Sequence, residues 1–359
     1  MMQEYSYKFG ECWSDNMAGE NWEVAWSSKQ TRVASLVCAG DGMIVASGAE
    51  VISYDSQGNI RWRRSMPFTV YRLGVDESNV GLLCGQGFHL LRISDGVPIH
   101  EGRATAGGFR DLMPRPSGGW ILSDRVGHLH LFNIRGIGIR RLNTGEIRRL
   151  IGWLDREHIL LHNEDGRIRC LRLVQQDYSR FIDEKNWSWT SRLSNGQVLL
   201  QATDGEVWVG MPHPFGWDEL DRIETVGTEP IDATRSGDGW WILDIDGLMQ
   251  KLPPSESSKE MIGGEFISGN GIDIMATASQ NGLIRWWESS KLSSERRAIT
   301  QKMVAQERER LDWENRRKMF EEARKSEDDG MLSRATELYQ ALGRSEDVRR
   351  MLERQSRGD

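Results

Sequence analysis

Residues 33–65 read VASLVCAGDGMIVASGAEVISYDSQGNIRWRRS, and this stretch decides the fold. It holds four short runs of apolar and β-branched residues, separated by Asp41-Gly42, Gly48 and Gln57-Gly58. Such residues supply the positive φ angles that hairpin turns require. The first three runs are almost continuously apolar, whereas the last alternates apolar residues with arginines. The sequence therefore predicts four antiparallel strands, of which only the last has a face in water.

The same unit recurs along the chain at a nearly constant interval. Each copy has an apolar run, a tight turn that ends in glycine, and a second apolar run. The seven turn glycines are Gly48, Gly87, Gly127, Gly166, Gly205, Gly247 and Gly282. Their gaps are 39, 40, 39, 39, 42 and 35 residues. A period of about 40 residues with strand-length runs is typical of propeller blades. We therefore expect an all-β, seven-bladed β-propeller.

The seventh copy is one strand short. After LIRWWES (283–289) the chain becomes charged and helix-forming, so the missing outer strand must come from elsewhere. The segment WEVAWSS (22–28) alternates apolar and polar residues, and we predict that it closes the ring beside Trp286. The 42-residue gap indicates an insertion at Met211–Glu219. The expected parts are an N-terminal extension (1–21), the propeller (22–290) and an α-helical C-terminal arm (291–359).

The arm begins as a charged helix, which we expect to extend to about Ser326 and to break at Asp328–Gly330. An amphipathic helix and a last helix capped by Ser345 should follow. A single pair of such helices cannot bury its own apolar face. We expect the propeller, a second copy of this chain or a foreign protein to cover it. The apolar residues proposed for that contact are Leu311, Trp313, Phe320, Leu338 and Leu342.

Three segments resemble known repeats. ATASQNGLIRWWESSKL (276–292) resembles a blade of the WD-repeat propellers, with Asn281-Gly282 for Asp-Gly and Trp287-Glu288 for Trp-Asp. VASGAEVISYDSQGNIRW (45–62) resembles the quinoprotein-like propellers instead. The segment 318–352 resembles a tetratricopeptide-like helical hairpin with one more helix. These resemblances imply a propeller that binds other proteins as a non-catalytic scaffold, one subunit of a larger complex.

Catalysis and bound cofactors are not expected. The sequence has no nucleophile elbow, phosphate-binding loop, dinucleotide fingerprint or HExxH motif. The four cysteines form no C-x-x-C pair, and His128-x-His130 has no third ligand nearby in sequence, so we expect no metal. No basic, apolar leader and no run of 18 apolar residues is present, so we expect a cytoplasmic protein without a membrane partner. A net charge of −7 argues against binding nucleic acid over the whole surface.

Two sets of residues are candidate binding surfaces. The first lies on the narrow propeller face, formed by the connections between blades and by the turns between the two middle strands of each blade. It comprises Met66, Phe68, Phe109, Arg125, Trp187, Asp204 and Asp246. Aromatic residues framed by charges are typical of protein interfaces. The alternative is that these aromatic residues fill the core.

The second set is basic and lies in the third and fourth repeats: Arg140, Arg141, Arg148, Arg149, Arg167 and Arg169. Gathered in one patch, these arginines would favour an RNA- or ribosome-associated protein. The alternative is that they cover solvated outer strands. A further possibility, a small-ligand or enzymatic propeller, would require a polar pocket in the central channel.

Overall fold

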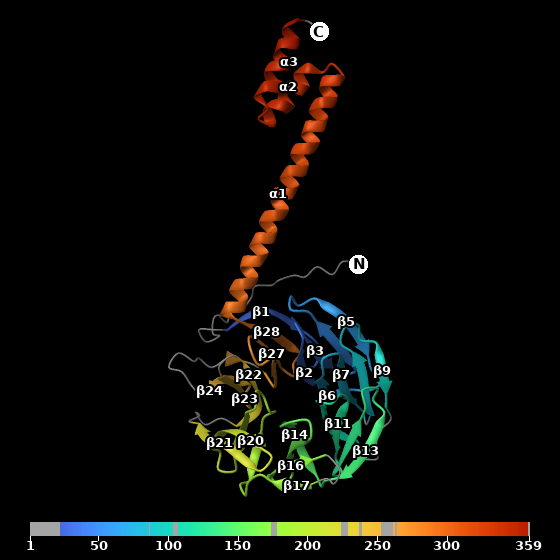
Figure 1. Ribbon diagram of the computed structural model, residues 1–359, viewed down its shortest axis with the longest axis vertical. Helices are drawn as coiled ribbons and strands as arrows, with labels where there is room; N and C mark the ends of the chain where they lie inside the picture. The colour runs from blue at the N-terminus through green and yellow to red at the C-terminus, as the bar shows by residue number, and fades with distance from the viewer. Residues whose placement is uncertain are drawn as a thin grey trace. The chain divides into compact units, whose positions relative to one another are not determined.

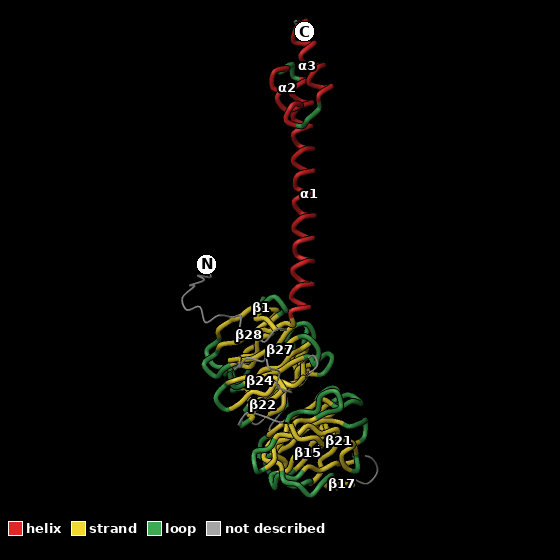
Figure 2. The backbone as a smooth tube through the Cα atoms, turned by 90° about the vertical axis from the view of Figure 1, so that its left-hand side faces the viewer, coloured by secondary structure: helices red, strands yellow, loops and turns green. Residues whose placement is uncertain are grey.

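The computed structural model describes residues 22–85, 87–102, 107–173, 178–223, 229–236, 239–252, 261–262 and 264–357. Seven four-stranded antiparallel sheets form a ring, and three helices follow it (Figure 1). The seven-bladed all-β propeller with a helical extension is thus confirmed. Figure 2 separates the strands of the ring from the helices of the arm by colour. The chain divides into two compact units, Met1–Leu292 and Ser293–Asp359.

At most of the blade junctions, the inner strands of neighbouring blades contact each other around the channel. Each blade is given from the channel outward. Blade 1 contains β2 (Ser35–Ala39), β3 (Gly42–Ser47), β4 (Glu50–Tyr54) and β5 (Ile60–Ser65), and blade 2 contains β6 (Val70–Val75), β7 (Asn79–Cys84), β8 (Gly87–Arg92) and β9 (Pro98–Glu101). Blade 3 contains β10 (Phe109–Pro114), β11 (Trp120–Asp124), β12 (His128–Phe132) and β13 (Gly138–Asn143), and blade 4 contains β14 (Ile147–Trp153), β15 (His158–Asn163), β16 (Ile168–Arg172) and β17 (Tyr178–Phe181). Blade 5 contains β18 (Trp187–Thr190), β19 (Val198–Ala202), β20 (Val207–His213) and β21 (Gly216–Ile223). Blade 6 contains β22 (Pro230–Ser236), β23 (Gly239–Asp244), β24 (Leu248–Leu252) and β25 (Met261–Ile262). Blade 7 contains β26 (Phe266–Gly269), β27 (Ile274–Ala278), β28 (Leu283–Ser289) and, as its outer strand, β1 (Trp22–Lys29).

Strand β1 supplies the outer strand of blade 7. It pairs antiparallel with β28 and places Trp26 opposite Trp286. The two indole rings stack, with centroids 6.2 Å apart and planes 12° apart. The first described strand of the chain therefore joins the last blade, which leaves no open end in the ring.

The core of the ring lies between blades rather than inside them. One cluster joins Phe88 of blade 2 to Phe109 and Trp120 of blade 3, and another joins Tyr54 of blade 1 to Trp286 of blade 7. Gly81 shows how tightly neighbours pack, because a Cβ atom there would lie 2.7 Å from the Trp120 ring. Each blade is thus stabilised mainly by the next one.

The predicted insertion Met211–Glu219 is an ordered hairpin and not an irregular loop. It extends β20 and β21, which remain paired as far as His213 and Gly216. Trp217 folds back from this extension and donates an Nε1 hydrogen bond of 2.6 Å to Asp183 Oδ2. The extra residues therefore lengthen one blade without opening the ring.

The second unit is formed by α1 (Ser290–Asp328), α2 (Leu332–Ala341) and α3 (Ser345–Arg357). Its core is a small cluster at the end of α1 that contains Ala323, Leu338, Tyr339 and Met351. The Glu327 carboxylate accepts hydrogen bonds from Tyr339, Arg350 and Arg354, at 3.0–3.1 Å. One ionised side chain therefore ties all three helices together.

Candidate functional site: the central channel

Charged residues line the channel because the inner strands are bulged. In blades 2 to 6 the register of the inner strand shifts by one residue before Arg72, Asp111, Arg149, Trp189 and Asp232. A bulge re-aims the side chain that follows it. Four of these five residues are charged, and they occupy equivalent places in successive blades.

Asp111 is the centre of the first charged group. Its Oδ1 atom accepts hydrogen bonds from Arg72 Nε at 3.0 Å and from Arg192 Nη2 at 2.6 Å. Its Oδ2 atom accepts the backbone N–H of Leu150 at 2.9 Å. These donors belong to blades 2, 5 and 4, so one buried carboxylate links four blades across the channel.

The pKa values in this group reflect competition between burial and charge. Burial alone would raise the pKa of Asp111, but Arg192, Arg72 and the Leu150 N–H outweigh it and hold the pKa at about 2. Burial lowers the pKa of Arg192 to about 10; Asp111 opposes this shift, and the positive charges of Arg72 and Arg149 add to it. Asp111 is ionised at neutral pH, and the arginines around it repel one another.

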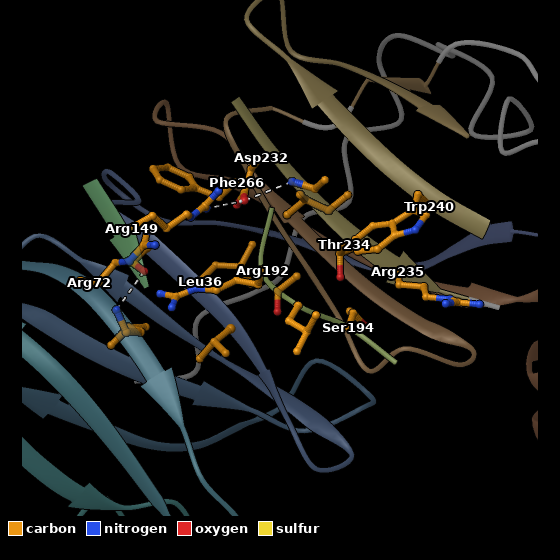
Figure 3. Close-up of a pocket in the computed structure, with 18 residues that line it drawn as sticks. Leu36, Arg72, Arg149, Arg192, Ser194, Asp232, Thr234, Arg235, Trp240 and Phe266 are labelled. Atoms are coloured by element: carbon orange, nitrogen blue, oxygen red, sulfur yellow. Dashed lines mark hydrogen bonds and ion pairs between the residues drawn. The ribbon is translucent and has the colours of Figure 1, made fainter. Parts of the chain in front are cut away.

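A second pair lies beside the first. Arg149 donates through Nη2 to Asp232 Oδ1 at 3.0 Å and through Nη1 to the backbone carbonyl of Thr190. Figure 3 shows Arg149 and Asp232 meeting at a pocket that Arg72, Arg192 and Arg235 also line. This pocket has a volume of about 240 Å³. A polar pocket in the channel was the condition for a small-ligand propeller.

A second cavity of about 360 Å³ adjoins the first and shares Arg72 and Arg149 with it. Arg110 and Arg148 line it, and both form ion pairs with Glu164. Also at this cavity, burial lowers the pKa of His162 to about 4, so its imidazole is neutral at pH 7.

Of the channel residues, the sequence had pointed only to Arg148 and Arg149, as part of a basic patch. The signal that could reveal Arg72, Asp111 and Asp232 is a charge at the third position of four inner strands, VYRLGV, FRDLMP, IRRLIGW and PIDATRS. Aligning the blade copies brings Arg72, Asp111 and Arg149 into one column. The pairing of these residues still depends on the closed ring.

The structure corrects the predicted interface on the narrow face at two positions. Phe109 and Trp187 are 2% and 0% exposed and pack between blades, so for them the core alternative holds. Both residues begin inner strands, where the next blade covers them. Phe68 differs, being 62% exposed over Gly85. Met66 is half-buried and packs against the core.

The charged members of that set lie in turns. Arg125, Asp204 and Asp246 are exposed, and each follows the second strand of its blade. With Phe68 they remain a predicted protein-binding surface.

The structure also corrects the single basic patch. Arg140 and Arg141 are exposed on the outer strand β13, whereas Arg148 and Arg149 belong to the inner strand β14. Arg167 and Arg169 stack on the Phe181 ring, at 3.8 and 5.0 Å from its centroid. The six arginines are therefore distributed across the width of the blades, and they do not form the continuous surface that RNA would need.

His128 and His130 both contact Asp124 Oδ2, at 3.1 and 2.9 Å. Within the described ranges no group of three His, Cys, Asp or Glu residues has the geometry to hold a metal ion.

None of the described helices combines the length and the apolar character that crossing a membrane demands.

The predicted contact residues of the arm fall into two groups. Leu311 and Trp313 are exposed on α1. Leu338 is buried in the small cluster of the arm, so self-association through it is contradicted by this conformation. Phe320 is half-buried and packs against this cluster, and Leu342 is half-buried.

A further surface lies on the rim of blades 2 and 3. Five exposed aliphatic residues, here called the aliphatic patch, belong to the outer strands β9 and β13 or to the turns before them: Val97, Ile99, Ile134, Ile137 and Ile139. The two blades touch here, because a Cβ atom at Gly136 would come within 2.4 Å of the His100 ring. A groove of about 780 Å³, lined by Ile134, Met113, Trp153 and Leu193 among others, adjoins the patch.

The comparisons with known proteins establish the fold class. No protein-family model matches the chain, and no curated protein matches it in sequence. Solved structures do match: BamB from Moraxella catarrhalis has 16% identity and a TM-score of 0.58, over 74% of this chain and 99% of that one. The β-propeller domain of Cps50 (Swd1) from Myceliophteria thermophila has 12% identity and a TM-score of 0.61, over 74% and 98%. With 1507 matching chains, the propeller is too widely shared to indicate one function.

Proposed function

We propose that this protein is a non-catalytic protein-interaction scaffold. The observation that carries the proposal is the aliphatic patch together with its groove. Apolar patches on a protein surface mark interaction sites, and we take these five exposed residues on two contacting blades as such a patch. Arg135, Arg140 and Arg141 lie beside the patch and are exposed. A protein partner that presents aliphatic side chains among acidic residues fits this surface by both shape and charge.

The arm offers a second, separate surface. The exposed apolar residues of α1 include Ile299, Met303, Leu311 and Trp313. An exposed helix that carries apolar side chains is suited to bind a groove or another helix. The scaffold would therefore hold one partner on the ring and another, or a second copy of the chain, on the arm.

Three full-length variants test the proposal by affinity capture from cells of the source organism, followed by mass spectrometry. Ile137→Ser with Ile139→Ser alters the patch, and Leu311→Ser with Trp313→Ser alters the arm. Ile60→Ser, an exposed isoleucine on the outer strand of blade 1, is the matched control. We expect the patch variant and the arm variant each to lose a different protein, and the control to lose none. If all three variants retain the same proteins in equal amounts, neither surface binds a partner.

A further inference from the structure

The central channel carries more positive charge than its acidic residues neutralise. Four arginines line the 240 Å³ pocket: Arg72, Arg149, Arg192 and Arg235. Among the described residues, two carboxylates, Asp111 and Asp232, are paired with them. An excess of two positive charges thus occupies the channel of a chain whose net charge is −7. Such a concentration of charge attracts anions into a narrow space.

Several guanidinium donors in this pocket have no acceptor within the part of the chain that the structure describes. Arg72 donates only through Nε, which leaves its two terminal nitrogen atoms unused. Arg235 donates through Nη1 to Gln197 Oε1 at 2.6 Å, and its buried Nε has no partner. A buried donor without an acceptor, such as Arg235 Nε, destabilises the protein. An anion that supplies acceptor oxygens would remove this cost.

We propose that the central channel binds a small, multiply charged anion of the phosphate class. Guanidinium groups present paired donors that match phosphate oxygens. Ser194 and Thr234 also line the pocket and add hydroxyl groups (Figure 3). The volume suits a compact anion and excludes a folded partner. The adjoining cavity, with Arg110 and Arg148, gives the anion a second arginine-lined space.

Isothermal titration calorimetry with pyrophosphate, at two salt concentrations, tests the proposal on the full chain. We expect the wild-type protein to bind, and to bind more weakly at the higher salt concentration. Arg235→Gln removes a positive charge that forms no ion pair with any described residue, and it should weaken binding about tenfold. Arg61→Gln, on the surface beside Asp41, is the matched control and should bind as the wild type does.

Asp232→Asn should change the affinity for pyrophosphate in the opposite direction. It removes a negative charge from the pocket and frees Arg149 Nη2, so pyrophosphate should bind more tightly. A residue with only a structural role would not strengthen binding when it is replaced. Should Asp232→Asn fail to fold, the comparison of Arg235→Gln with Arg61→Gln still decides. The proposal is overturned if wild-type protein does not bind pyrophosphate, or if the two arginine variants bind it equally.

Discussion

The ring and the arm bury their apolar residues in different ways. In the ring each core cluster belongs to two neighbouring blades, so every blade depends on the next. In the arm one small cluster holds three helices, and only Ser293, Ala323 and Ser326 of the 39-residue α1 are buried. The exposed part of α1 is supported mainly by its own backbone hydrogen bonds and by ion pairs such as Arg317–Glu321. Damage should therefore spread through the ring and stay local in the arm.

Deleting residues 1–29 should have the largest effect, because it opens the ring. It removes β1 with Trp22, which is buried, and Trp26, which stacks on Trp286. Loss of the buried Trp22 should cost about 3–5 kcal/mol, and loss of the β1–β28 pairing and of Trp26 adds to it, so we expect the ring to lose more than about 5 kcal/mol. Thermal unfolding followed by circular dichroism measures the loss. A chain that begins at residue 22 keeps β1 and is the control; equal melting temperatures for the two deletions would show that closure does not stabilise the ring.

The next effect separates two aromatic residues that the sequence could not tell apart. Trp187→Ala should destabilise the ring by about 3–5 kcal/mol, because Trp187 is completely buried between blades 4 and 5. Phe68→Ala should cost less than about 1 kcal/mol, because its ring is mostly in water. Chemical denaturation gives both values. A large loss at Phe68 would contradict its place on the surface.

These two residues show what the sequence could and could not establish. The seven blades were predictable because each repeats the same turn glycines and apolar runs, and the closing strand was predictable because LIRWWES lacks its outer neighbour. The burial of Trp187 was not predictable from the sequence, because it depends on the side chains of blade 4. An aromatic residue at the start of an inner strand lies one or two positions from an exposed connection. The sequence of its own blade therefore does not decide whether the side chain is buried in the core or exposed on the surface.

The charged channel illustrates the same limit more strongly. Asp111 contacts Arg72 and Arg192, which lie in other blades and far away in sequence. Local patterns give strands and turns, but they do not reveal which charges a ring brings face to face. The bulge before Asp111 adds a one-residue shift that reverses the direction of a side chain. The sequence showed the arginines of the predicted basic patch. It did not show that some of them lie on inner strands and others on outer strands.

Acid should weaken the ring through His162. Its pKa is about 4 in the folded chain, below the ordinary value of 6.5, because burial disfavours the imidazolium. The unfolded chain therefore takes up a proton first as the pH falls. The corresponding stability, about 3 kcal/mol, is present above pH 6.5 and is lost as the pH falls to about 4. Denaturation measured across this range should show the loss, and His162→Gln should reduce it; an unchanged profile in the variant would assign the loss to other groups.

A smaller effect than these losses in the ring core is expected in the arm. Glu327→Gln keeps the size of the side chain but removes the charge that accepts hydrogen bonds from Tyr339, Arg350 and Arg354. We expect the arm to lose about 1–3 kcal/mol, since bonds to a charged group are worth more than neutral ones. Hydrogen exchange should rise in α2 and α3 and stay constant in the strands of the ring. Glu353→Gln, on the exposed surface of α3, is the matched control. Faster exchange in the ring of the Glu327 variant would show that the two units are coupled, contrary to the local response expected of a small, separate core.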